Sequence, residues 1–169
     1  LSLPGFSELG AESSRKQQDA LKTTTRWVFS LAFPTFLLMA LFPEKIMILL
    51  FGSQYSTAST ALAILAFGNL IGSSTGQLGS FIKSNSNTKI VFWNTSANLI
   101  FNLGLNVILI PIYGIEGAAI ATAASTIFIE TILLIEVYRL HGAQPFSKKM
   151  LYSIPAGFTS LIITYAIFK

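Results

Sequence analysis

Cysteine is absent from this sequence, and histidine occurs only once, at His141. No disulfide framework can form, and no thiolate is available as a metal ligand or a nucleophile. The single histidine lies in a polar stretch, which leaves no histidine cluster for a metal. We therefore expect neither a metal site nor a cofactor.

Charge is also scarce. Charged residues make up 11% of the chain, against roughly 25% in an ordinary soluble domain. Hydrophobic residues make up 52%, and the 14 phenylalanines are not typical of a disordered chain. There is no run of like charges that would indicate a nucleic-acid partner. The composition predicts a protein that is embedded in a lipid bilayer.

Long apolar segments account for most of the chain. A helix needs about 20 mostly apolar residues to cross ~30 Å of hydrocarbon. Five segments approach or exceed this length, and turn residues or charges separate them. The predicted spans are about 27–42, 57–82, 90–110, 115–138 and 150–168. They are too long for barrel strands and do not alternate strictly, so the fold class is an all-α, polytopic transmembrane helix bundle.

The predicted domain organisation is simple. Residues 1–26 form a polar segment, and residues 27–169 form the transmembrane helical domain. The chain begins at Leu1, and no pattern of a secretory signal peptide is found. We interpret the sequence as a fragment of a longer protein.

Basic residues divide unevenly between the two ends of these spans. One end has Lys45 and Lys169, and the other has nine basic residues: Arg15, Lys16, Lys22, Arg26, Lys83, Lys89, Arg139, Lys148 and Lys149. Positive charge marks cytoplasmic loops, so we expect the nine-residue end and the N-terminal segment to be cytoplasmic. The expected location is the cell (cytoplasmic) membrane, with several passes.

Aromatic residues follow the same division. Trp and Tyr favour the two membrane–water interfaces. The residues predicted near the cytoplasmic interface are Trp27, Trp93, Tyr138 and Tyr152, and those near the outer one are Tyr55, Tyr113 and Tyr165.

Asparagine recurs every fourth residue in the third span, at Asn94, Asn98, Asn102 and Asn106. Four residues advance a helix by about 400°, so the four amides cover an arc of about 120° on one side. Such a stripe either forms hydrogen bonds with a neighbouring helix or lines a hydrated cavity that receives a polar cargo. The spacing leaves both interpretations open. Asn69 and Gln77 in the second span are further candidates for the cavity.

Small residues recur at helical spacing in two spans. Gly68, Gly72 and Gly76 lie on one side of the second span, and Gly117 and Ala121 lie on one side of the fourth. Small side chains allow membrane helices to approach closely, so we predict two packing faces. A face that bends or slides during a conformational change is the alternative for the second span.

Glu130 lies deep in the fourth span. An ionisable group near the centre of a membrane helix costs about 2.5–3.5 kcal/mol on insertion scales, so it should meet water or a partner. Glu130 is a candidate for coupling to a proton or cation. The simpler interpretation is that it reaches the interface or pairs with Lys83, Lys89 or Arg139.

Three stretches resemble a known family. ILIPIYGIEGAAIATAAS at 108–125 follows the asparagines, LPGFSEL occupies 3–9, and LLFGSQYSTAS occupies 49–59. Their order and spacing resemble the polysaccharide flippases of the multidrug/oligosaccharidyl-lipid/polysaccharide exporter superfamily. The resemblance covers nearly the whole chain and places it in the second of two six-helix lobes that enclose a central cavity.

The resemblance implies a mechanism and partners. The lobes of such flippases rock, so that the cavity opens alternately to each side and carries the glycan of a polyisoprenoid-diphosphate-linked oligosaccharide across. The expected partners are membrane lipid, that glycan substrate and the N-terminal lobe of the same protein, with no nucleic acid. No Lys or Arg lies deep in a span, so the diphosphate would meet at most the rim cations Arg26, Lys83 and Lys89.

Other functions compete with this one. A cation-coupled multidrug exporter of the toxin-extrusion type would be favoured if Glu130 faced aromatic side chains rather than amides. A membrane enzyme needs a cluster of acid, base or metal ligands, whereas the carboxylates here are scattered, so we expect a transporter. A purely structural subunit would leave the asparagine stripe without a purpose.

Overall fold

A computed structural model describes residues 4–75, 78–85, 88–146 and 155. Within them every regular element is a helix, which confirms the all-α class. The elements are α1 (Pro4–Leu41), α2 (Pro43–Phe51), the 3-10 helix η1 (Ser53–Ala58), α3 (Ser59–Thr75), α4 (Leu78–Asn85) and α5 (Thr88–His141). Except for residue 155, the predicted span 150–168 lies outside the described residues.

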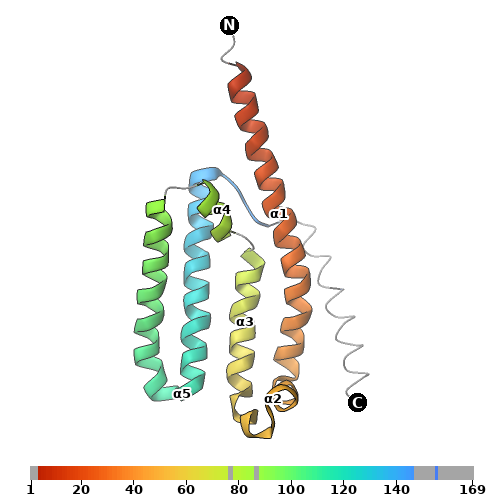
Figure 1. The fold of residues 1–169 in the computed structure, drawn as a ribbon, viewed down its shortest axis with the longest axis vertical. Helices are drawn as coiled ribbons and strands as arrows, with labels where there is room; N and C mark the ends of the chain where they lie inside the picture. Colours follow the sequence, from red (N-terminus) through yellow and green to blue (C-terminus); the bar gives the residue numbers. More distant parts are fainter. Residues whose placement is uncertain (1–3, 76–77, 86–87, 147–154, 156–169) are drawn as a thin grey trace.

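The longest element, α5, is a hairpin of two helical limbs. Gly114 has φ 58° and ψ −130°, which is not helical, and the chain reverses there (Figure 1). Glycine tolerates this positive φ because it has no Cβ. Gly117 is buried in the same turn, where a Cβ would collide with the carbonyl of Leu109. The PIYGIEG sequence therefore joins residues 88–113 (the first limb) to residues 115–141 (the second limb) through a very tight turn.

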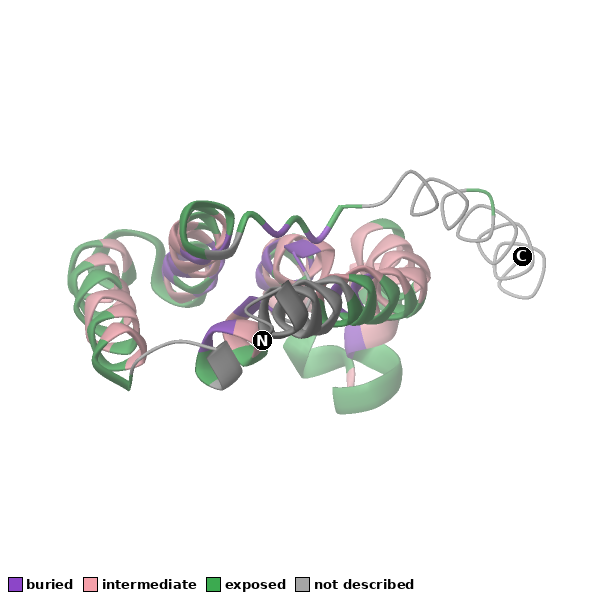
Figure 2. Ribbon diagram, turned by 90° about the horizontal axis from the view of Figure 1, so that it is seen from above, coloured by how far each residue is buried: buried purple, intermediate pink, exposed green. Residues whose placement is uncertain are grey.

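Four long helical segments stand side by side in the order first limb, second limb, α3 and α1 (Figures 1 and 2). The second limb runs parallel to α3, because Gly68 lies against Ala123 and Thr75 lies against Glu130, the same distance along both helices. The predicted span 57–82 is divided between α3 and α4. In consequence α3 is the central helix, with α1 on one side and α5 on the other.

The main apolar core lies at one end of this row. Leu78 and Ile82, one turn apart on α4, are fully buried, whereas Lys83 on the opposite side of α4 is exposed. The core cluster consists of Leu21, Leu78, Ile82, Leu133, Val137 and Ala143. Thus α4 joins α1 to the second limb of α5, and this amphipathic short helix closes one end of the row.

Three stretches of described helix are long and apolar enough to cross a membrane: Lys16–Leu41, Ser53–Thr75 and Thr88–Leu140. Their large apolar side chains are mostly turned outward, with Leu31 and Val107 each 75% exposed. Surfaces of this kind are stable against lipid or neighbouring membrane helices but not in water. The chain is part of a multi-pass membrane protein.

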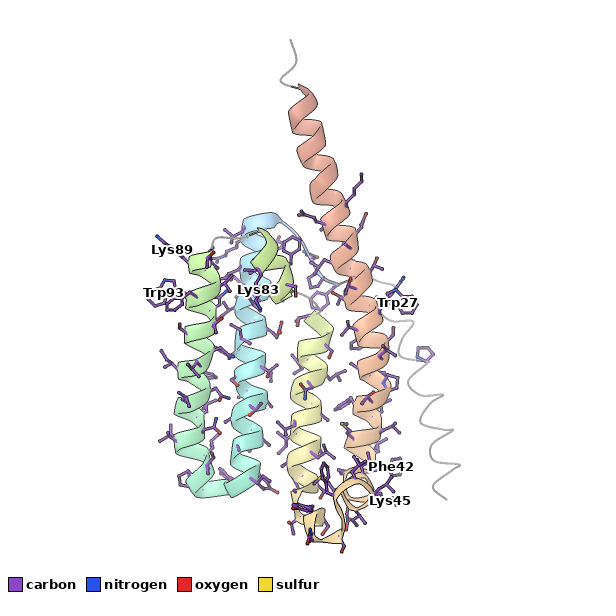
Figure 3. All side chains as sticks on the ribbon, viewed as in Figure 1. Trp27, Phe42, Lys45, Lys83, Lys89 and Trp93 are labelled. Carbon is purple, nitrogen blue, oxygen red and sulfur yellow. The ribbon has the colours of Figure 1, made fainter. Side chains whose placement is uncertain are left out.

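Charged and aromatic residues mark the two ends of the row. Figure 3 shows Lys83, Lys89, Trp27 and Trp93 toward the end closed by α4, and Lys45 with Phe42 at the other. The ammonium of Lys45 lies 5.6 Å from the ring of Phe42. These residues divide between the two ends as the sequence predicts. That the end closed by α4 is cytoplasmic stays a prediction from the positive-inside rule.

Candidate functional site

The asparagine stripe faces the second limb of α5. The amide of Asn94 donates a hydrogen bond to Glu136 Oε2 at 2.6 Å. The amide of Asn102 donates to Ser125 Oγ at 2.8 Å, and also lies 3.4 Å from the carbonyl of Ala121. These bonds join the two limbs along most of their length. Three of the stripe's four members therefore make hydrogen bonds within α5, because Asn106 donates to the carbonyl and side-chain oxygens of Asn102.

An aromatic pair supports the same seam. The rings of Phe101 and Phe128 are stacked with their centroids 4.3 Å apart. Offset stacking of this kind adds about 0.5–1.5 kcal/mol beyond the buried area. The asparagine stripe thus lies beside an apolar contact between the two limbs. Its amides lie on the side of the first limb that faces the second limb.

A small pocket opens where α4 meets both limbs. Its volume is about 250 Å³. Ile82, Val91 and Leu133 form apolar parts of its wall. We call this cavity the polar pocket. Its polar lining residues are Lys83, Asn94, Thr95, Asn98 and Glu130. The fold therefore brings two stripe asparagines, the intramembrane carboxylate and one rim cation into a single site.

Asn98 is the stripe member with unused hydrogen-bonding capacity. Its Oδ1 is buried and accepts no hydrogen bond from the described residues. Leaving a buried acceptor unsatisfied costs about 1–3 kcal/mol. A group that donates to this oxygen would recover that cost. Asn98 is accordingly the best candidate for contact with a polar ligand.

Glu130 lies between the polar pocket and α3. Its Oε2 accepts a hydrogen bond of 2.6 Å from the hydroxyl of Thr75. From the sequence we predicted that Glu130 reaches the interface or pairs with a basic residue, namely Lys83, Lys89 or Arg139, and Thr75 was not foreseen. No spacing pattern links residues 55 positions apart, so only the packing of α3 on α5 could show this pair. Lys83 lines the same pocket and is exposed at its mouth.

The glycines of α3 allow this hydrogen bond to form. A Cβ at Gly68 would lie 2.8 Å from the Cα of Ala123, so the two backbones touch. A Cβ at Gly72 would lie 3.3 Å from Cγ2 of Thr126. This side of α3 packs on the second limb, in the manner of small-residue faces in membranes. Gly76 lies outside the described residues.

Ala121 and Gly117, which the sequence predicts on one packing face of the fourth span, lie in different surroundings. Ala121 is fully buried in the seam, where its carbonyl faces the amide of Asn102. Gly117 instead packs within the hairpin turn, against its own chain at Leu109. Its small size therefore serves the reversal of the chain.

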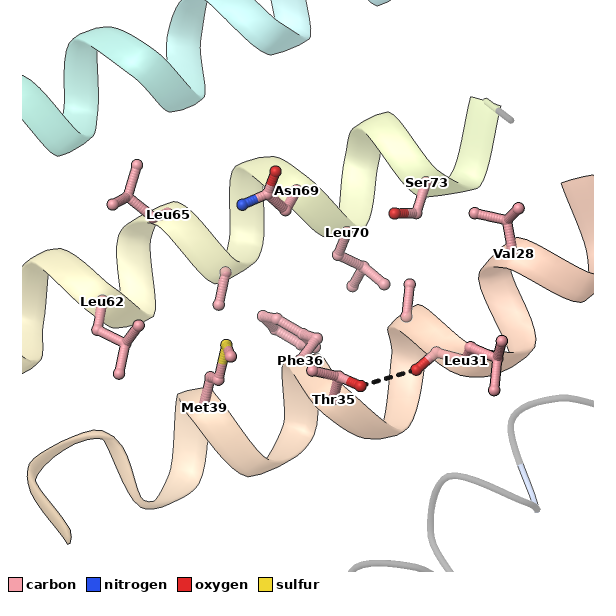
Figure 4. A pocket seen from close by; sticks show the side chains of 12 residues that line it. Val28, Leu31, Thr35, Phe36, Met39, Leu62, Leu65, Asn69, Leu70 and Ser73 are labelled. Carbon is pink, nitrogen blue, oxygen red and sulfur yellow. Dashed lines mark hydrogen bonds between the residues drawn. The ribbon is translucent and has the colours of Figure 1, made fainter. Parts of the chain in front are cut away.

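The remaining predicted cavity residues lie elsewhere. Asn69 is exposed in a separate groove of about 580 Å³ between α1 and α3. Leu31, Phe36 and Met39 of α1 line that groove, with Ser73 near one end (Figure 4). Gln77 lies outside the described residues. The structure thus separates Asn69 from the asparagine stripe, because the second limb of α5 and the body of α3 lie between them.

Two of the rim cations are not part of the polar pocket. Arg26 is half-buried on α1, with its guanidinium 5.9 Å from the ring of Trp27. Lys89 is exposed in the first turn of α5. Among the described residues of the pocket lining, Lys83 alone contributes a positive charge.

Comparison with known proteins places these features in a family. Residues 7–108 match the model of the MatE family. An uncharacterised membrane protein of Methanocaldococcus jannaschii is 36% identical over 135 residues, which cover 76% of this chain and 25% of that protein. Agl15 of Haloferax volcanii, named a probable low-salt glycan biosynthesis flippase, is 32% identical over 124 residues, which cover 71% of this chain and 26% of that protein.

The chain spans about a quarter of the length of these two relatives. No solved structure matches it. The matches therefore cover one part of each of these two longer proteins.

Proposed function

The chain belongs to the MatE family, and on that premise we propose that the full-length protein is a flippase for a polyisoprenoid-diphosphate-linked oligosaccharide. It works by alternating access, as the sequence resemblance implies. The family match and the flippase relative indicate a membrane transporter of the exporter or flippase type. We propose in addition that the cargo is the glycan of this lipid and that the mechanism is alternating access.

The polar pocket is the observation that carries it. Sugar hydroxyls both donate and accept hydrogen bonds, and amides and carboxylates supply both kinds of partner. Asn98 Oδ1 accepts no bond from the described residues although it is buried. A hydroxyl donor from a glycan would satisfy this oxygen once a shift of the pocket wall exposes it to the cavity. At about 250 Å³ the pocket is smaller than the roughly 300–1,000 Å³ of common ligand sites, which suits one wall of a cavity shared with the rest of the protein.

The residues of the site divide into roles. Asn94 and Asn98 contact the glycan, whereas Asn102 and Asn106 hold the two limbs of α5 together. Lys83 meets the diphosphate, and Arg26 and Lys89 attract it to the rim from either side. Asn69 and Gln77 remain candidates for contacts in other conformations.

Glu130 is the coupling residue in this proposal. The hydroxyl of Thr75 donates to one of its oxygens at 2.6 Å. The other oxygen is available to a proton or cation from the polar pocket, which Glu130 lines. A proton would remove the negative charge of Glu130 and a cation would compensate it, and either would weaken its attraction to Lys83. The charge of Glu130, at the contact between α3 and α5, would thereby depend on whether a proton or cation is bound from the polar pocket.

A cation-coupled multidrug exporter is the second candidate, because membership of the MatE family accords with it equally well. The groove between α1 and α3 favours it, since Phe36 and Met39 offer the aromatic and adaptable surface that apolar drugs bind. The polar pocket that Glu130 lines favours the flippase, because its described lining contains the amides of Asn94 and Asn98 and no aromatic ring.

The deciding experiment compares two asparagine variants of the full-length protein in a glycan flipping or complementation assay. Asn98→Leu should abolish or strongly reduce flipping while the protein folds normally, because Asn98 Oδ1 has no bond to lose among the described residues. Asn102→Leu should instead lower stability, because it removes the bond to Ser125. Normal flipping by a folded Asn98→Leu protein rejects the glycan site. Drug efflux without glycan flipping by the wild-type protein supports the multidrug exporter.

A further inference from the structure

A second groove lies beside the end of α5, on the side of the second limb away from the polar pocket's asparagines. Its volume is about 560 Å³. It is lined by Leu134, Ile135, Tyr138, Arg139, Gln144 and Phe146. This size falls within the roughly 300–1,000 Å³ typical of small-molecule sites. Nothing in the glycan proposal uses it.

The lining of this groove is amphipathic along its length. Leu134 and Ile135 form its apolar part, and Tyr138 and Arg139 lie one helical turn closer to the end of α5. This separation of four residues corresponds to about 6 Å along the axis. An apolar wall that leads within 6 Å to a guanidinium and a phenol matches a molecule with an apolar chain and a charged head.

The segment after α5 completes the groove. Gly142 has φ 59°, and its N–H donates to the carbonyl of Tyr138 at 3.0 Å, which ends the helix. Ala143 and Pro145 are then buried, while Gln144 and Phe146 are exposed. The buried pair fastens the segment to the core, so that the alternate side chains are held at the groove. Phe146 adds an apolar face, and Gln144 adds a donor beside Arg139.

The hydrogen bonds of the hairpin fix the depth of the groove. Because Asn94 bonds to Glu136, these residues lie at the same height, and Tyr138 and Arg139 lie near the level of Trp93. Trp93 is 70% exposed and Tyr138 is 57% exposed, at the end that also presents Lys83 and Lys89 (Figure 3). Aromatic and basic side chains at one level are typical of the membrane–water interface.

We infer that this groove binds an anionic phospholipid of the surrounding leaflet, with the phosphate at Arg139 and an acyl chain along Leu134 and Ile135. Arginine binds phosphate through two parallel N–H donors, and Tyr138 adds a hydroxyl donor. Arg139 is exposed near the end of α5, so its guanidinium is accessible to a head group. The carbonyls at the end of α5 favour a cation, which Arg139 itself supplies.

Charge selects the lipid class. Basic pockets at the cytoplasmic side of membrane proteins attract anionic head groups, and each Lys or Arg near the surface contributes about 1 kcal/mol. A zwitterionic lipid has a positive group that Arg139 would repel. A free phosphate would not contact the apolar wall formed by Leu134, Ile135 and Phe146. Only a molecule with both parts uses the whole groove.

The test measures lipid retention by the purified full-length protein. The protein is exchanged into nanodiscs that contain equal phosphatidylglycerol and phosphatidylcholine, and bound lipids are counted by native mass spectrometry after release. We expect selective retention of phosphatidylglycerol. Arg139→Gln should reduce this selectivity about fivefold, the effect of one basic residue at the surface, whereas Arg139→Lys should retain part of it.

Two controls separate the groove from general attraction. Lys22→Gln removes a basic residue next to Leu21, near the same end but outside the groove, and should change selectivity little. Phe146→Ala should reduce retention of both lipids, because the apolar wall is shortened. Equal losses in Arg139→Gln and Lys22→Gln, no preference in the wild-type protein, or displacement by free glycerol phosphate would each overturn the inference. Circular dichroism must show equal helicity in all variants.

Discussion

The contact between Gly68 of α3 and Ala123 of α5 offers the sharpest test of the packing. A Cβ at Gly68 would lie 2.8 Å from both the Cα and the Cβ of Ala123. Carbon atoms pack best at about 3.5–4.0 Å, so Gly68→Ala requires the two helices to separate by about 0.7–1.2 Å. Because one of the contacted atoms belongs to the backbone, no side-chain rotation can relieve the clash.

The expected loss of stability follows from two opposing terms. Overpacking costs about 1–3 kcal/mol, whereas alanine gains about 1 kcal/mol over glycine in a helix. Gly104→Ala is the matched control, because nothing lies within 4 Å of a Cβ at that position. The two variants should therefore differ by about 1–3 kcal/mol in free energy of unfolding.

A third variant, Gly72→Ala, should give an intermediate loss of stability. At Gly72 the nearest atom to an added Cβ is Cγ2 of Thr126, at 3.3 Å. A side-chain end can shift by a few tenths of an ångström, so Gly72→Ala should lie between the other two. Reversible unfolding of the full-length protein in mixed micelles, followed by circular dichroism, gives the three values. Equal stability of the Gly68 and Gly104 variants would refute the close approach of α3 and α5.

Further predictions concern single interactions. Thr75→Val removes the donor to Glu130 and should cost about 0.6–1.7 kcal/mol, the range of hydrogen bonds in membranes, whereas Thr75→Ser should be near wild type in the same unfolding assay. Asn102→Leu should cost a similar amount, and Asn98→Leu should cost nothing; equal losses would contradict the hydrogen-bond assignment. Gly114→Ala places a side chain at φ 58° and should cost about 1–3 kcal/mol, which a thermal melt followed by tryptophan fluorescence would show.

Several features of the molecule could be predicted from residue patterns alone. Long apolar segments predict membrane helices, because lipid offers no partner for free backbone groups. The PIYG stretch predicts a break between two helices, and the structure has the chain reversal at Gly114. The asparagine spacing predicts one polar side of a helix. In each case the information is local, within a few turns of the chain.

The partners of those features could not be predicted in this way. The same stripe would suit a neighbouring helix or a glycan, and only the tertiary structure shows that Asn102 meets Ser125 while Asn98 Oδ1 meets no described donor. Asn69 belongs to the same polar set by composition, yet it lies in a different groove.

The sequence by itself therefore determined the fold class, the division of charge between the two ends and the residues that share a helix face. Tertiary structure decided which face meets which helix, above all the pairing of Thr75 with Glu130. The physical reason is that lipid is as apolar as a leucine side chain, so an apolar face does not specify its partner. Specificity comes from close backbone approach at residues such as Gly68 and from a few polar pairs, and these depend on two helices at once.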